Sequence, residues 1–186
     1  LLQGKYSSEY DFSDHMSGVD TLIEKGIADP ERLFITGGSA GGIASAYAIG
    51  LTNRFKAAVV AKPVINWLSK VLTADSGLYQ IPFQFPGKPW DNVEHYWKRS
   101  PLSLVGNVTT PTMLITGVED KRTPMSETEQ FYQALKLQKV DSVLVKVPGS
   151  SHGIASKPSR MVAKIENILA WFKKYDDKAL NADTAR

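Results

Sequence analysis

The chain has 186 residues, enough for one domain with a sizeable core, and its 42% hydrophobic and 22% charged residues are typical of a soluble globular protein. Its net charge is +3 with the lysines and arginines scattered along the chain, so nothing indicates a nucleic-acid partner. No run of about 18 apolar residues predicts a membrane span, and the lack of cysteine excludes disulfides, cysteine-ligated zinc and a thiol nucleophile.

The first elements are a predicted loop and a predicted helix. Residues 1–12 are polar and aromatic without a clear period, which favours a loop. We expect a helix that begins after the capping residue Asp14 and ends at Gly26. Its apolar side chains would share one face, formed by Met16, Val19, Leu22 and Ile23.

The next stretch has the pattern of a nucleophile elbow. A short apolar strand at residues 33–35 runs into a glycine cluster, and residues 43–49 follow as a helix. Ser39 stands between Gly37 and Gly41 in the G-x-S-x-G pattern of α/β-hydrolases. A Cβ atom at either glycine is expected to clash where strand and helix meet. Neither a Walker A nor a G-x-G-x-x-G pattern fits these glycines, which leaves a purely structural turn as the alternative.

Apolar runs and helical patterns alternate after the elbow, as in a parallel sheet. Strands are expected at residues 55–61, 112–116 and 142–147, helices at 91–98, 124–137 and 158–175, and a polar tail at 176–186. The last helix is expected to bury Met161, Ile165, Ile168, Leu169 and Phe172. The pattern predicts an α/β fold with a mostly parallel sheet flanked by helices.

Residues 63–89 interrupt the alternation with aromatic residues and prolines, and they read as irregular. One interpretation is a long surface excursion that packs its own aromatic side chains. The other is a wall of the substrate pocket beside the nucleophile, for which Trp67 and Val64 are the candidates.

The loops after the third and fourth strands supply candidates for an acid and a base. His152 lies in a short loop after a strand, whereas His15 and His95 lie in predicted helices. Asp120 and Glu119 both follow the third strand. We favour Asp120, because its shorter side chain holds an imidazole N–H more rigidly.

Together these residues predict a catalytic triad in the chain order of α/β-hydrolases, serine, acid and histidine. Ser39 would be the nucleophile, His152 the base and Asp120 the residue that orients His152. The main-chain N–H of Ala40 would supply one donor to an oxyanion hole.

Several segments resemble the catalytic domain of the prolyl oligopeptidase family, most closely its acylaminoacyl-peptidase and dipeptidyl-aminopeptidase branch. They are the nucleophile motif at 29–42, a middle region at 66–68 and 89–102, an aspartate loop at 117–124, a helix at 131–135 and a histidine loop at 148–153. Three residues depart from the branch: Ala40 stands where it often has tyrosine, and Lys121 and Thr123 replace commoner residues.

The resemblance implies a serine peptidase that acts on short peptide substrates and needs no cofactor or metal. It also implies that residues 1–186 are the C-terminal part of a hydrolase domain, with upstream strands, a second oxyanion donor and a β-propeller outside this chain. A carboxylesterase or lipase of the same fold is the main alternative, and a non-catalytic binding module is another. A soluble cytoplasmic or periplasmic protein without a membrane partner is expected, with a homo-oligomer left open.

Overall fold

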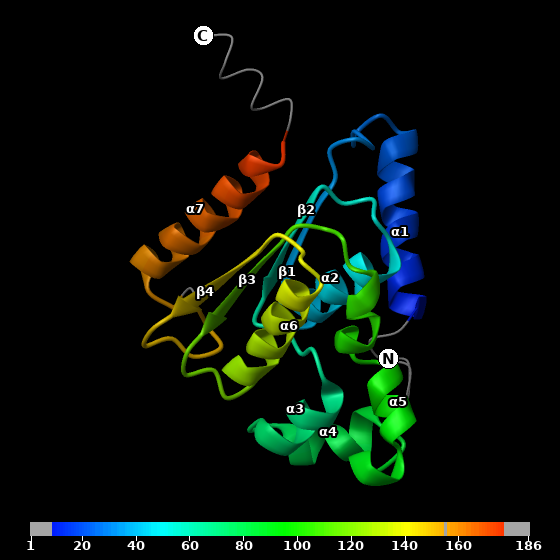
Figure 1. Ribbon diagram of the computed structural model, residues 1–186, viewed down its shortest axis with the longest axis vertical. Helices are drawn as coiled ribbons and strands as arrows, with labels where there is room; N and C mark the ends of the chain where they lie inside the picture. The colour runs from blue at the N-terminus through cyan, green and yellow to red at the C-terminus, as the bar shows by residue number, and fades with distance from the viewer. Residues whose placement is uncertain (1–8, 155, 177–186) are drawn as a thin grey trace.

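The computed structural model describes residues 9–154 and 156–176, which form a parallel sheet between layers of helices (Figure 1). The strands are β1 (Phe34–Gly38), β2 (Ala57–Ala61), β3 (Thr112–Gly117) and β4 (Ser142–Val147), hydrogen-bonded in that order. The α-helices are α1 (Glu9–Glu24), α2 (Ala40–Leu51), α3 (Trp67–Thr73), α4 (Gly77–Gln84), α5 (Val93–Lys98), α6 (Met125–Leu137) and α7 (Pro158–Lys174). Two 3-10 helices, η1 (Pro89–Asp91) and η2 (Pro101–Asn107), flank α5. The predicted parallel sheet is confirmed.

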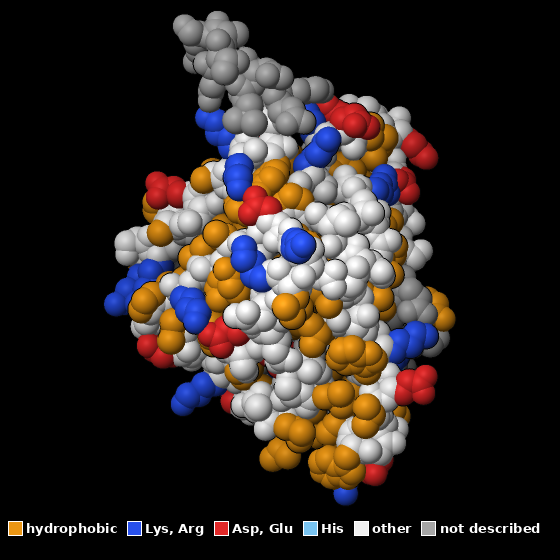
Figure 2. Space-filling view, in the orientation of Figure 1, with side chains coloured by type: hydrophobic (Ala, Val, Ile, Leu, Met, Phe, Trp, Pro, Cys, Tyr) orange, Lys and Arg blue, Asp and Glu red, His pale blue; other side chains and the backbone are white. Residues whose placement is uncertain are grey.

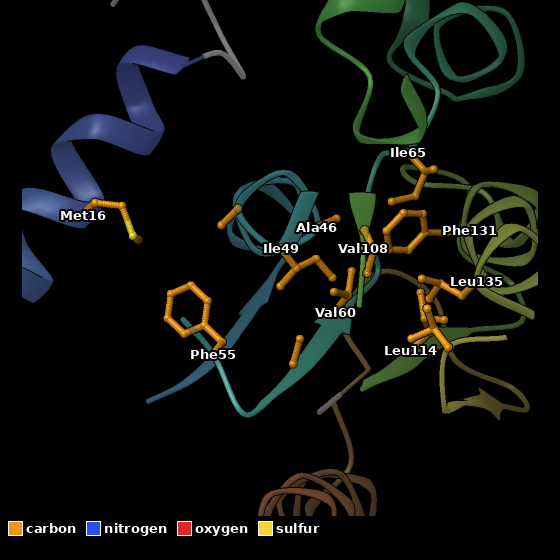
Figure 3. Close-up of a cluster of buried hydrophobic side chains, with 13 residues drawn as sticks. Met16, Ala46, Ile49, Phe55, Val60, Ile65, Val108, Leu114, Phe131 and Leu135 are labelled. Atoms are coloured by element: carbon orange, nitrogen blue, oxygen red, sulfur yellow. The ribbon is translucent and has the colours of Figure 1, made fainter. Parts of the chain in front are cut away.

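Both faces of β2 are covered, which explains its unbroken apolar sequence. Ala58 and Val60 point into a cluster with helices α1, α2 and α6 (Figure 3). Ala57, Val59 and Ala61 point to the other face, where they pack with Trp171 of α7. Alternate residues of one strand therefore join two separate cores.

The first helix begins earlier than its sequence suggested. It contains Glu9–Phe12, which were expected to be part of a loop, while residues 1–8 lie outside the described part of the chain. Phe12 and Val19 pack against the core on either side of Met16, which is 8% exposed, so the apolar face extends beyond Asp14. Leu22, predicted to lie on the apolar face, is 43% exposed.

The segment expected to be irregular instead contains α3, α4 and η1. Gly77 permits the close approach of α3 and α4, since a Cβ atom there would overlap the main-chain oxygen of Val71. Trp67 and Phe85 pack edge to face, with ring centroids 5.1 Å apart. Other large side chains of this segment stay exposed, and hydrophobic groups gather at this end of the molecule (Figure 2): Leu72, Leu78, Tyr79, Phe83 and Trp90.

Helix α7 buries a narrower face than its apolar pattern predicted. Ile168 and Phe172 contact the second core, together with the buried Trp171. Met161, Ile165 and Leu169 were expected inward but are 52%, 48% and 62% exposed. The apolar pattern was wrong for these three residues because burial depends on what packs against a helix, and the second core reaches only Ile168, Trp171 and Phe172 of α7. The predicted polar tail at 177–186 lies outside the described residues.

Candidate active site

The elbow between β1 and α2 has the close backbone contacts that its glycines allow. Ser39 has φ 59° and ψ −117°, an unfavourable conformation for a residue with a side chain. A Cβ atom on Gly37 would lie 2.3 Å from the main-chain oxygen of Gly41, and one on Gly42 would lie 2.5 Å from that of Ala61. The expectation for Gly41 itself was wrong, since a Cβ atom there meets nothing within 4 Å.

The Ser39 main chain is fixed on both sides of this turn. Its N–H donates to the main-chain oxygen of Ala61 in β2, at 3.1 Å, and its carbonyl oxygen accepts from Ile43 in α2, at 3.0 Å. The backbone thus holds the serine between the strand and the helix N-terminus. Ala40 is the first residue of α2, so its N–H precedes the first intrahelical hydrogen bond and lies beside Ser39.

The sheet brings the three predicted triad residues together. Ser39 Oγ lies 3.0 Å from His152 Nε2, and His152 Nδ1 lies 2.7 Å from Asp120 Oδ2. A carboxylate can only accept, so the imidazole proton lies on Nδ1 and is donated to Asp120. This leaves Nε2 free to accept from the serine hydroxyl. The side chain of His152 is 27% exposed and that of Asp120 is fully buried.

Hydrogen bonds keep the buried Asp120 ionised. Burial by itself would raise its pKa, but the hydrogen bond with His152 and those from Thr123 outweigh this effect and lower the pKa. Oδ1 accepts from the main-chain N–H groups of Arg122 and Thr123, each at 2.9 Å. The neighbouring Glu119 is exposed, so the structure places Asp120 rather than Glu119 against His152.

Thr123 and Lys62 also contact this centre. The sequence predicted that Thr123, as a departure from the family pattern, does not touch the triad, and this was wrong. It gave Lys62 no role. The Thr123 hydroxyl lies 3.0 Å from Asp120 Oδ2, 3.2 Å from His152 Nδ1 and 3.1 Å from the main-chain oxygen of Lys62. The Lys62 ammonium donates to the main-chain oxygen of His152, at 2.7 Å. The signal that the sequence carried was Asp120 itself, because aspartate side chains commonly accept from the main chain two residues on, as Asp120 does from the N–H of Arg122.

The other sequence candidates lie apart from the triad. His15 is exposed on α1, and His95 packs edge to face against Phe85, with ring centroids 6.1 Å apart. Val64 and Trp67, the proposed pocket residues, are 2% and 1% exposed. They share a buried cluster with Ile43 of α2, which connects them to the helix that follows the nucleophile.

A buried carboxylate links this cluster to the helix that follows the Asp120 loop. Glu127 of α6 accepts hydrogen bonds from the main-chain N–H groups of Ile65 and Asn66, at 3.0 and 2.8 Å, and from the Ser69 hydroxyl. Burial raises the pKa of Glu127, although these hydrogen bonds oppose the shift. Because α6 begins five residues after Asp120, the start of α3 is held in a fixed position relative to the triad.

Within the described residues, His, Asp and Glu side chains form no group of three or more that could hold a metal ion. In that same part of the chain, no helix is long and apolar enough to cross a membrane.

Comparison with known proteins gives one consistent result. The model of the prolyl oligopeptidase family matches residues 4–179. An uncharacterised peptidase of Bacillus subtilis, YuxL, is 34% identical over 94% of this chain and 27% of its own length. The acylaminoacyl peptidase of Pyrococcus horikoshii superposes with a TM-score of 0.88 at 28% identity, covering 94% of this chain and 29% of that one.

A second solved structure is an acylaminoacyl peptidase in complex with Z-Gly-Gly-Phe-chloromethyl ketone. It has a TM-score of 0.86 and 29% identity, over 92% of this chain and 28% of that one. The chain therefore spans less than a third of the length of each of these relatives.

Proposed function

Because the chain belongs to the prolyl oligopeptidase family, we propose that it carries the catalytic groups of a serine peptidase that hydrolyses short peptides. The observation that carries the proposal is the hydrogen-bonded series of Ser39, His152 and Asp120 at one rim of the sheet. A serine hydroxyl bonded to an imidazole, which is bonded in turn to a buried carboxylate, is the arrangement of nucleophilic acyl transfer.

In the proposed reaction, Ser39 Oγ attacks the scissile carbonyl carbon while His152 Nε2 takes the hydroxyl proton. Asp120 stabilises the resulting imidazolium through Nδ1. The carbonyl oxygen becomes an oxyanion, to which the N–H of Ala40 donates. When the intermediate collapses, the C–N bond breaks, and the leaving amine takes the proton from Nε2. Water, deprotonated by His152, then hydrolyses the acyl-enzyme and restores Ser39.

We further propose that residues 1–186 form the C-terminal part of a hydrolase domain whose sheet continues at β1. Among the described residues, β1 pairs only with β2, so its other edge is open to a further strand. A second oxyanion donor would come from such an added segment.

A fluorophosphonate probe tests the nucleophile directly, because it reacts with an activated serine. We expect it to label the protein at Ser39 and to leave the Ser39→Ala variant unlabelled. Labelling that persists in Ser39→Ala would contradict the assignment. Turnover of aminoacyl nitroanilides compared with nitrophenyl esters then separates a peptidase from a carboxylesterase, since the peptidase also cleaves the amide.

A further inference from the structure

Lys62 connects the loops that carry the acid and the base, although β2, which it follows, contributes no triad residue. Its ammonium donates to the main-chain oxygen of His152, at 2.7 Å. Its own carbonyl oxygen lies 3.1 Å from the Thr123 hydroxyl, which in turn contacts Asp120 Oδ2. Its N–H donates to the main-chain oxygen of Ile115 in β3, at 2.8 Å. One residue thus contacts three neighbouring segments of the rim.

The conformation of Lys62 is unfavourable for a lysine. Its φ is 42°, in the left-handed region where glycine is the preferred residue. Burial lowers the pKa of its ammonium, repulsion from Lys164 adds to this effect, and attraction to Asp120 opposes it. A glycine would relieve the backbone and avoid the burial of a charge, but it could not reach His152.

The loop that carries His152 is held to the loop of Asp120 by the Glu119 N–H, which donates to the main-chain oxygen of Ser150 at 3.0 Å, and the Lys62 contact adds a hydrogen bond at the histidine itself. Gly149, with φ 62°, and Gly153 lie on either side of the histidine, and glycine restricts the backbone less than other residues do. Among the described residues, the hydrogen bond from the Lys62 ammonium links the main chain of His152 to the segment that follows β2. Fixing this carbonyl fixes the peptide plane beyond His152, and with it the direction of the imidazole.

We propose that Lys62 is a positioning residue for the triad. Its ammonium holds the main chain of His152, and its carbonyl oxygen accepts from the hydroxyl of Thr123, whose main-chain N–H donates to Asp120 Oδ1. Acid and base then keep their relative placement while the imidazole passes a proton from Ser39 to the leaving group. This inference rests on the proposed peptidase function. Lys62 itself takes no part in bond making or proton transfer.

The test compares three substitutions of Lys62 in the complete protein, with a peptide nitroanilide as substrate. Lys62→Met keeps the length of the side chain and its backbone contacts but removes the donor, and we expect kcat to fall roughly 10- to 100-fold with little change in KM. Lys62→Arg restores a cationic donor and is expected to recover most of the activity. Lys62→Gly removes the donor while relaxing the backbone, so we expect an unchanged or higher melting temperature together with the same fall in kcat.

Lys56→Met is the matched control, because Lys56 is an exposed lysine one residue before β2. It is expected to retain wild-type kcat and KM. Wild-type kcat in Lys62→Met or Lys62→Gly would overturn the inference, and so would a loss that follows the melting temperature and is not restored by arginine. If Ser39→Ala keeps full turnover in the same assay, the proposed function itself fails, and that outcome is distinct from any effect at Lys62.

Discussion

A Cβ atom on Gly37 would lie 2.3 Å from the main-chain oxygen of Gly41, well inside any normal contact distance. The end of β1 and the first turn of α2 thus meet backbone to backbone beneath Ser39. Of these two glycines, only Gly37 must lack a side chain, because a Cβ atom on Gly41 meets nothing within 4 Å.

This asymmetry predicts different effects for the two alanine variants. Gly37→Ala is expected to lower the free energy of unfolding by roughly 3 kcal/mol, since backbone must move to make room. Gly41→Ala is expected to leave it within about 1 kcal/mol of wild type, since alanine favours a helix. Urea unfolding of both variants measures the difference, and equal losses would contradict the geometry.

Asp120→Asn is expected to lower kcat by about 10⁴-fold without unfolding the protein. Asparagine has nearly the same shape, but its amide cannot stabilise an imidazolium and favours the wrong tautomer of His152. Glu119→Gln is the matched control, because Glu119 is exposed and adjacent, and it should change kcat by less than about threefold. A large loss in Glu119→Gln with activity retained in Asp120→Asn would reverse the assignment of the acid.

Trp67→Phe is predicted to change the relative kcat/KM among substrates that differ in the hydrophobic side chain before the scissile bond. The phenyl ring leaves space in the cluster that Trp67 shares with Val64 and Ile43. Trp67→Ala should in addition lower the free energy of unfolding by about 3–5 kcal/mol, because the side chain is 1% exposed. Trp90→Phe, at a ring that is 63% exposed, is the control. If Trp67→Phe scales the rates of all substrates equally, the residue only packs.

From the buried ammonium of Lys70 we predict that the free energy of unfolding rises in alkaline solution. Burial lowers its pKa to about 8, helped by repulsion from Arg122 and opposed by Asp75, Glu127 and Asp120. The unfolded chain has the ordinary value of 10.5 and so binds more protons than the folded chain between pH 8 and 10.5. The free energy of unfolding therefore increases as pH rises across this window, by at most about 3 kcal/mol.

Lys70→Met removes this titration. We expect the variant to be more stable than wild type near pH 7, with the difference shrinking as pH rises through 8 to 10.5. Urea unfolding at several pH values measures it. A difference that is independent of pH would show that the buried ammonium keeps an ordinary pKa.

The free edge of β1 predicts self-association of residues 1–186 expressed alone. Among the described residues β1 pairs on one side only, and an exposed strand edge is a template for another chain. Thr36 is exposed on this strand, so Thr36→Lys should reduce the association. Light scattering after size exclusion gives the mass.

Fluorophosphonate labelling of residues 1–186 expressed alone is expected to be about 10²- to 10³-fold slower than in the complete protein, if a second oxyanion donor is missing. A monomer with full peptidase activity would contradict both expectations.

The sequence by itself determined the strands, the elbow and the family. Strands buried on both faces appear as unbroken apolar runs, so β2 and β3 could be located without knowing their neighbours. Ser39, Asp120 and His152 could be chosen as candidates because each follows a predicted strand, and parallel strands bring their carboxyl ends to one rim. These are local patterns combined with one rule of sheet geometry.

Only the tertiary structure decided which apolar side chains are covered and which polar groups meet. Met161 and Leu169 fit the apolar face of α7, yet they are exposed, because burial depends on what packs against a helix and not on its own period. The contacts of Lys62 with Thr123 and His152 join residues 61 and 90 positions apart. No spacing predicts them, because a hydrogen bond between distant residues exists only after the sheet has set the positions of the strand ends.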